Sequence, residues 1–116
     1  MFLSTIFTSI AALSLGVSAA PTVNAYPRYA QLRLYGEPGC FDQNLGELGV
    51  YDERLNSCQT FGDDYTIRSV AFEYRLRDNC TVSVYDDVTC NLNRHDVELG
   101  ACLSGDKQYG SYLVQC

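Results

Sequence analysis

The sequence has 116 residues, a formal net charge of −6, six cysteines and a hydrophobic fraction of 47%. This length suits one domain and leaves no room for two. With 8 Lys and Arg residues against 14 Asp and Glu residues, the chain lacks the basic surface that neutralises phosphates, so nucleic acid is excluded as a partner. The same balance argues against anchoring to anionic lipid.

The N-terminal segment has the composition of a secretory signal peptide. Residues 1–27 carry no charged side chain, and the apolar stretch from Phe2 to Val17 is too short and too rich in Ser and Thr to span a membrane. Small residues typical of a cleavage site precede both Ala19 and Ala25, and we favour cleavage after Ala19. We therefore expect a signal peptide at 1–19, an N-terminal extension at 20–29 and one domain at 30–116, in a secreted, extracellular protein with no membrane span.

All the cysteines lie beyond this segment: Cys40, Cys58, Cys80, Cys90, Cys102 and Cys116. An even number of cysteines in a short secreted chain indicates disulfides rather than metal ligands. No Cys-x-x-Cys pair occurs and His95 is the only histidine, so a zinc site is not expected.

From residue 30 onward the sequence repeats itself. Four landmarks of the first half recur in the same order in the second half. Leu32–Tyr35 followed by Cys40 matches Val82–Tyr85 followed by Cys90, and Glu47–Gly49 matches Glu98–Gly100. Further along, Cys58 followed by Gly62 matches Cys102 followed by Gly105, and Ser69 matches Ser111. Such ordered matches indicate a duplication, with motif one at 30–77 and motif two at 78–116.

Both motifs are predicted to form short strands. Apolar residues alternate at Leu32/Leu34, Val70/Phe72/Tyr74, Val82/Val84 and Val97/Leu99/Ala101, and turn compositions occur at 36–39, 52–54, 62–64, 78–79 and 104–106. No helical apolar stripe follows the N-terminal segment. The sequence therefore predicts an all-β sandwich of two four-stranded antiparallel units.

The segment from Phe61 to Val70, placed after the strands and the Tyr-x4-Cys hairpin, resembles a Greek-key motif of the βγ-crystallins, and the second half resembles another. The best match is Asp64–Ser69, which is similar to the family's Asx-Asx-x-x-Ser/Thr-Ser segment. With a signal peptide and six cysteines, the chain resembles the small secreted crystallin-like proteins of filamentous fungi, a group that includes apoplastic effectors and is related in fold to a yeast killer toxin.

The repeat also suggests a pairing of the cysteines. Equivalent cysteines of a repeat should pair equivalently, so Cys40–Cys58 and Cys90–Cys102 would each staple one motif. Cys80 and Cys116 have no counterparts in motif one and would form the third pair.

The resemblance raises calcium as a cofactor, with Asp64, Ser69, Asp106 and Ser111 as the ligands that match the family's segment. Tyr65 and Arg68 in the first copy, and Lys107 and Gly110 in the second, depart from it. A cationic side chain in each loop opposes Ca²⁺, so we disfavour calcium and expect no cofactor. The other reading makes the aspartates turn formers and the serines hydrogen-bond partners of loop backbone.

No enzyme is expected. His95 lies in the polar connection 93–96 and is interpreted as a solvated loop residue, and no Gly-x-Ser-x-Gly elbow accompanies any serine. The neighbouring carboxylates Asp63/Asp64 and Asp86/Asp87 should point apart rather than into one cleft.

Two further features concern the surface. Asn79-Cys80-Thr81 is the only glycosylation sequon. Six tyrosines could form an exposed aromatic face for recognition, namely Tyr26, Tyr29, Tyr51, Tyr65, Tyr109 and Tyr112. We favour the alternative, in which Tyr35, Tyr74 and Tyr85 are strand residues and the others are half-buried caps.

The resemblance implies a monomeric, non-enzymatic apoplastic effector that binds a host extracellular protein or glycan. Two alternatives remain open: an antimicrobial or killer-toxin-like protein, and a calcium-binding structural crystallin-like protein. The net charge of −6 counts against the former, because attraction to anionic membranes favours cationic surfaces.

Overall fold

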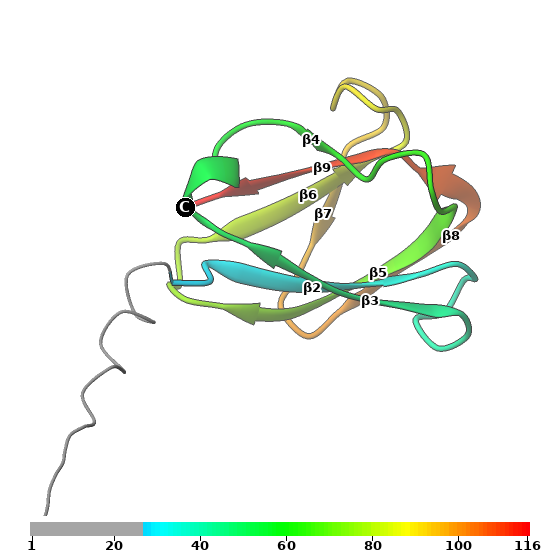
Figure 1. The fold of residues 1–116 in the computed structure, drawn as a ribbon, viewed down its shortest axis with the longest axis horizontal. Coiled ribbons are helices and arrows are strands. Elements are labelled where there is room, and N and C mark those ends of the chain that lie inside the picture. The colour runs from blue at the N-terminus through cyan, green and yellow to red at the C-terminus, as the bar shows by residue number, and fades with distance from the viewer. Residues whose placement is uncertain (1–26) are drawn as a thin grey trace, which may run out of the picture.

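The computed structural model describes residues 27–116, which form two antiparallel four-stranded sheets packed face to face (Figure 1). The predicted signal peptide, with both cleavage positions, lies outside these residues. The strands are β2 (Ala30–Tyr35), β3 (Asn44–Val50), β4 (Gln59–Thr60), β5 (Ile67–Arg75), β6 (Thr81–Tyr85), β7 (His95–Val97), β8 (Cys102–Tyr109) and β9 (Ser111–Gln115), with one short 3-10 turn, η3 (Asp52–Arg54). The all-β prediction is confirmed. Within 27–116 no helix has the length and hydrophobicity needed to cross a membrane.

The two halves of the chain exchange one strand each. The first sheet has the order β3-β2-β5-β8 and the second has the order β4-β9-β6-β7. Each sheet thus holds three strands of one half and the third strand of the other half. Two four-stranded antiparallel sheets agree with the sequence prediction, and neither sheet coincides with motif one or motif two. Because β4 pairs with β9 and β8 pairs with β5, the halves cannot separate without breaking backbone hydrogen bonds in both sheets.

The core lies between the sheets and follows from the alternation along each strand. Leu32 and Phe72 point inward from the first sheet, and Val84 and Val114 point inward from the second, each with at most 1% of its surface exposed. Burying one such side chain contributes about 1.5–3 kcal/mol relative to leaving it in water. The inner faces of both sheets therefore form the hydrophobic core that stabilises the fold.

The outer face of the first sheet is polar. Arg33 on β2 bridges Glu47 on β3 and Glu73 on β5, with N–O distances of 2.8 Å on both sides. These contacts pair charges across three neighbouring strands. The face away from the core is thus a solvated surface, as the alternation of polar and apolar residues predicts.

Two of the predicted local elements are wrong. The strand expected through Val97, Leu99 and Ala101 ends at Val97, because Gly100 takes a positive φ of 84° and closes a turn. The turn expected at 104–106 lies inside β8. There the pairing with β5 jumps from Ser69↔Ser104 to Ile67↔Tyr109, so the turn composition forms a bulge rather than a chain reversal.

Candidate functional site

Two hairpin loops of similar conformation join the strands at one end of the sandwich. The first loop (36–43) connects β2 to β3, and the second loop (86–94) connects β6 to β7. Both loops place non-glycine residues at positive φ in equivalent positions: Cys40 and Gln43 at 55°, Cys90 at 57° and Asn93 at 52°. Residues other than glycine rarely adopt this left-handed backbone conformation. Its recurrence at the same positions shows that the duplicated sequence folds into duplicated loops.

A buried serine holds the first loop against its sheet. The Ser69 hydroxyl donates a hydrogen bond of 2.6 Å to the backbone oxygen of Glu37 and accepts one of 2.9 Å from the backbone N–H of Cys40. Ser69 is fully buried. Its hydroxyl therefore satisfies two backbone groups that the loop could not pair within itself.

The second loop repeats this arrangement. The Ser111 hydroxyl donates to the backbone oxygen of Asp87 at 2.6 Å and accepts from the N–H of Cys90 at 3.0 Å. The other two residues considered as calcium ligands, Asp64 and Asp106, are exposed. Within residues 27–116 no three His, Cys, Asp or Glu side chains gather as a metal-binding group. In both copies the serine of the candidate pair thus bonds loop backbone, whereas the aspartate lies on the exposed surface.

The disulfides are Cys40–Cys102, Cys58–Cys90 and Cys80–Cys116. The predicted pair Cys80–Cys116 is confirmed, and the predicted pairs Cys40–Cys58 and Cys90–Cys102 are wrong. The strand exchange is the reason. Cys102 begins β8, which lies in the first sheet beside the first loop, and Cys58 precedes β4, which lies in the second sheet beside the second loop. Each loop cysteine therefore bonds to the other half of the chain.

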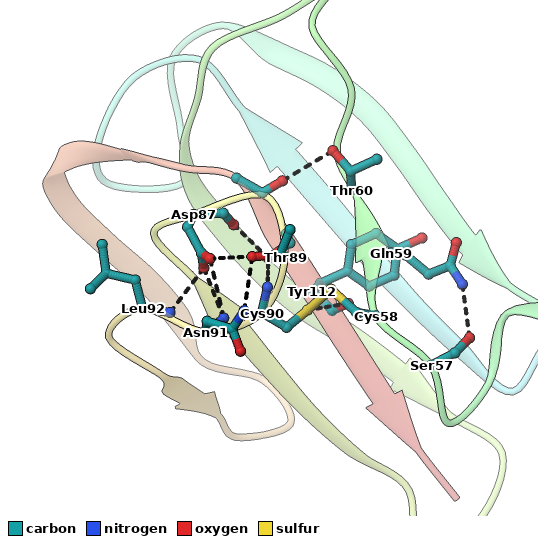
Figure 2. Close-up of a disulfide and its surroundings, with 12 residues drawn as sticks. Ser57, Cys58, Gln59, Thr60, Asp87, Thr89, Cys90, Asn91, Leu92 and Tyr112 are labelled. Carbon is teal, nitrogen blue, oxygen red and sulfur yellow. Dashed lines mark hydrogen bonds between the residues drawn. A yellow bond between two sulfur atoms is a disulfide. The ribbon is translucent and has the colours of Figure 1, made fainter.

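The second loop is also organised by Asp87 (Figure 2). Its carboxylate accepts hydrogen bonds from the Thr89 hydroxyl at 2.7 Å and from the backbone N–H groups of Leu92 at 2.9 Å and Asn91 at 3.0 Å. These bonds, with the Thr89 hydroxyl as the largest contribution, lower the pKa of Asp87 to about 2. An ionised Asp87 therefore fixes the loop at neutral pH.

The two loops expose large apolar side chains. Phe41 in the first loop is 83% exposed, and Val88 and Leu92 in the second loop are 58% and 54% exposed. These residues lie outside the set of tyrosines that the sequence offered as a recognition surface. The available signal was an apolar side chain inside a run of turn-forming residues, as at Phe41 between Cys40 and Asp42.

The tyrosines do not form a common face. Tyr35, Tyr74 and Tyr85 lie on strands, as predicted. Tyr109 and Tyr112 are buried strand residues rather than half-buried caps, with 4% and 1% of their surfaces exposed. Tyr29 and Tyr51 are half-buried, Tyr65 is exposed, and Tyr26 lies outside the described residues. Tyr65 alone of the five described candidates could offer a free aromatic ring.

His95 is not a solvated loop residue. It begins β7, its Nε2 lies 3.0 Å from Oδ1 of Asp86, and its ring packs edge-on against Tyr109. Together with Lys107, these residues line a cleft of about 400 Å³ between the second loop and β8. The Asn93 amide makes the largest contribution to lowering the pKa of Asp86, and His95 lowers it further.

The carboxylates of Asp86 and Asp87 engage different partners, so they do not converge on one reacting atom. In the described part of the chain, the side-chain hydrogen bond of His95 goes to Asp86 and not to a serine or cysteine. This contact couples the second loop to the beginning of β7.

No known protein family, curated protein or solved structure matches the chain. Function therefore has to be argued from the geometry of the described residues. That geometry consists of two covalently fixed loops, each tied to its sheet by a buried serine, and each presenting apolar side chains to solvent.

Proposed function

We propose that this chain is a secreted, disulfide-stabilised protein of the βγ-crystallin-like type that acts without catalysis, as an apoplastic effector that binds a host extracellular target through its two hairpin loops. The observation that carries the proposal is the exposure of Phe41, Val88 and Leu92 on loops that are held by disulfides and buried serines. Because these apolar side chains stand on fixed loops at the surface, they are available to bury against a partner.

The strand order supports the crystallin-like part of the proposal. In the first half, β5 returns to lie beside β2, and β2 also pairs with β3. In the second half, β9 returns beside β6, which also pairs with β7. A fourth strand that returns beside the first is the connection of a Greek key, here with the third strand of each half placed in the opposite sheet.

Rigidity supports a binding role for the loops. Disordered loops lose conformational entropy when they dock, and each rotamer-rich side chain that becomes fixed costs about 0.5–1.5 kcal/mol. In this protein the loop backbones are already held by Cys40–Cys102 and Cys58–Cys90 and by the bonds to Ser69 and Ser111. A target therefore meets a preorganised surface.

The chemistry of the exposed side chains favours a protein partner over a glycan. Val88 and Leu92 are aliphatic, and they fit an apolar depression on a protein. Sugars, by contrast, stack on aromatic rings, of which the two loops expose only Phe41 among the described residues.

The test compares matched variants for binding. Labelled wild-type protein, the double variant Phe41→Ser/Leu92→Ser and the control Leu76→Ser are applied to host intercellular fluid and to host tissue. Leu76 is also exposed, at 40%, but lies beyond the opposite end of β5. We expect the double variant to lose saturable binding and Leu76→Ser to retain it. Equal binding by all three proteins would contradict a role for the loops.

Secretion is tested separately. The abundance of the protein in the medium of the producing organism is compared with its abundance in the intercellular fluid of colonised host tissue. Enrichment in the host supports the effector proposal. High secretion without a host would favour a different extracellular role, which growth-inhibition assays against competing microbes would then examine.

A further inference from the structure

The turn between β5 and β6 contains a sequon whose three residues alternate between solvent and core. Asn79 and Thr81 are exposed, whereas Cys80 between them is fully buried and bonded to Cys116. The backbone N–H of Cys80 donates to the oxygen of Arg77 at 3.1 Å and closes the turn. In the described part of the chain the Asn79 amide makes no side-chain hydrogen bond, so it is free on the surface.

This turn lies at the end of the sandwich opposite the two hairpin loops. Arg75, at the end of β5, pairs with Ala30, whereas Tyr35, which enters the first loop, pairs with Ser69 at the beginning of β5. In the second sheet, Thr81 begins β6 and Tyr85 ends it just before the second loop. Figure 1 shows the turn near the C-terminus, away from the loop that joins β2 to β3. The five residues of β6 alone separate the turn from the second loop by roughly 13 Å.

The order of translocation exposes the sequon before its disulfide can close. Cys116 follows Cys80 by 36 residues. A chain that enters the secretory pathway with its N-terminus first presents Asn79 to the transferase while Cys116 is still outside. Once the bridge forms, Cys80 is buried and the sequon backbone is held at the beginning of β6, where it can no longer adapt to an enzyme site.

We propose that Asn79 carries an N-linked glycan that is added before the Cys80–Cys116 bridge closes; this inference rests on the proposed secretion. The Asn79 side-chain nitrogen forms a bond to the anomeric carbon of a lipid-diphosphate-linked oligosaccharide. The bond from that carbon to the diphosphate oxygen breaks, the lipid diphosphate leaves with the electron pair, and the amide proton passes to the base of the transferase.

The position explains how a glycan and a binding surface coexist. A glycan is bulky and solubilising. At Asn79 it would stand on the turn that also carries the exposed Leu76. The apolar side chains of the two hairpin loops lie at the other end and stay accessible to a partner.

The experiment expresses the full chain in a eukaryotic secretory host, once with its own N-terminus and once behind an established cleavable signal peptide. Secreted protein is digested with peptide-N-glycosidase and analysed by mass spectrometry of peptides. We expect a fraction of the chains to lose mass with conversion of Asn79 to aspartate, and Asn79→Gln to abolish this change completely. We also expect Cys116→Ser to raise the glycosylated fraction, because Cys80 then stays unpaired.

The variant Cys102→Ser is the matched control, since it removes a different disulfide and leaves the sequon and its bridge intact. If Cys116→Ser raises the glycosylated fraction more than Cys102→Ser does, the result supports glycosylation before the Cys80–Cys116 bridge closes. Equal rises of the glycosylated fraction in the two variants overturn that order of events. An unmodified Asn79 in both the wild type and Cys116→Ser, with entry ensured by the added signal peptide, overturns the whole inference. Retention of the chain inside the cell only when it carries its own N-terminus would instead contradict the proposed secretion.

Discussion

The Ser111 hydroxyl lies 2.6 Å from the backbone oxygen of Asp87, 24 residues earlier in the chain. The same side chain accepts a hydrogen bond from the N–H of Cys90, so one buried group closes both sides of the second loop. Ser69 does this for the first loop with Glu37 and Cys40. The shape of both loops therefore depends on a strand residue that is distant in sequence, and not on the turn sequence alone.

Replacing Ser111 by alanine should destabilise the protein by about 1–3 kcal/mol, because two backbone groups of the second loop then lose their partner in a buried site. Ser69→Ala should cost a similar amount, since its two bonds are equivalent. Urea unfolding at neutral pH measures both values. Ser57→Ala, at an exposed position, is the control. If Ser111→Ala lowers the free energy of unfolding no more than Ser57→Ala does, the result would contradict a stabilising role for the Ser111 hydrogen bonds.

Stability should fall in acid partly through Asp87. Its pKa in the folded protein is about 2, below its ordinary value of 3.8. A carboxyl group with a lowered folded pKa contributes stability above its unfolded pKa, and this contribution is lost as the pH falls through the folded value. The stability gap between wild type and Asp87→Asn should therefore be widest near neutral pH and should shrink between about pH 4 and pH 2.

Melting temperatures measured from pH 2 to pH 7 test this prediction. Asp64→Asn, which removes one exposed negative charge outside the loop, corrects for the change in net charge. A gap between wild type and Asp87→Asn that stayed constant down to pH 2 would argue against ionised Asp87 as the group that fixes the loop.

Tryptic digestion without reduction should separate the observed disulfide pairing from the pairing suggested by the repeat. Trypsin places Cys40 in peptide 34–54, Cys58 in 55–68, Cys102 in 95–107 and Cys116 in 108–116, and leaves Cys80 and Cys90 together in 78–94. The structure predicts that 34–54 is linked only to 95–107. A linked pair of 34–54 with 55–68 would instead support Cys40–Cys58 and contradict the strand exchange.

Tyr112→Phe should leave the stability unchanged or raise it by about 1 kcal/mol. The Tyr112 hydroxyl is buried and has no hydrogen-bond partner among the described residues. Burial raises the pKa of this phenol, and the nearby Arg54 guanidinium opposes the rise without reaching hydrogen-bonding geometry. The ring contact with Phe61, at 5.0 Å, does not need the hydroxyl. A clear loss of stability in urea would reveal a partner for the hydroxyl in solution.

Calcium should not raise the melting temperature. The Ser69 and Ser111 hydroxyls already form hydrogen bonds with loop backbone. Arg68 adds positive charge to the candidate segment 64–69, and Lys107 adds it to the candidate segment 106–111. A ligand that binds only the folded state stabilises it in proportion to the logarithm of its concentration. Thermal unfolding with added calcium, with magnesium as the control, measures the effect. A saturable rise specific to calcium would restore the predicted ligands to consideration.

The alternation of apolar and polar residues was enough to predict an all-β sandwich, because a strand that is buried on one face shows a period of two in its own sequence. The repeat likewise revealed the duplicated loops, and the two cysteines without counterparts, Cys80 and Cys116, revealed one disulfide. These features are local or are written twice in the chain, so they can be recognised without knowing which strands are neighbours.

Only the tertiary structure decided which strands pair across the halves. The period of the apolar residues indicates which face of a strand is buried. It does not indicate which strands pair by hydrogen bonds with the edges of β4 and β8. The exchange of these strands swapped the partners of Cys40 and Cys90. The course of β8 also placed Tyr109 and Lys107 at the cleft that His95 and Asp86 line. The candidate site therefore depends on contacts between distant segments, which the sequence pattern does not encode locally.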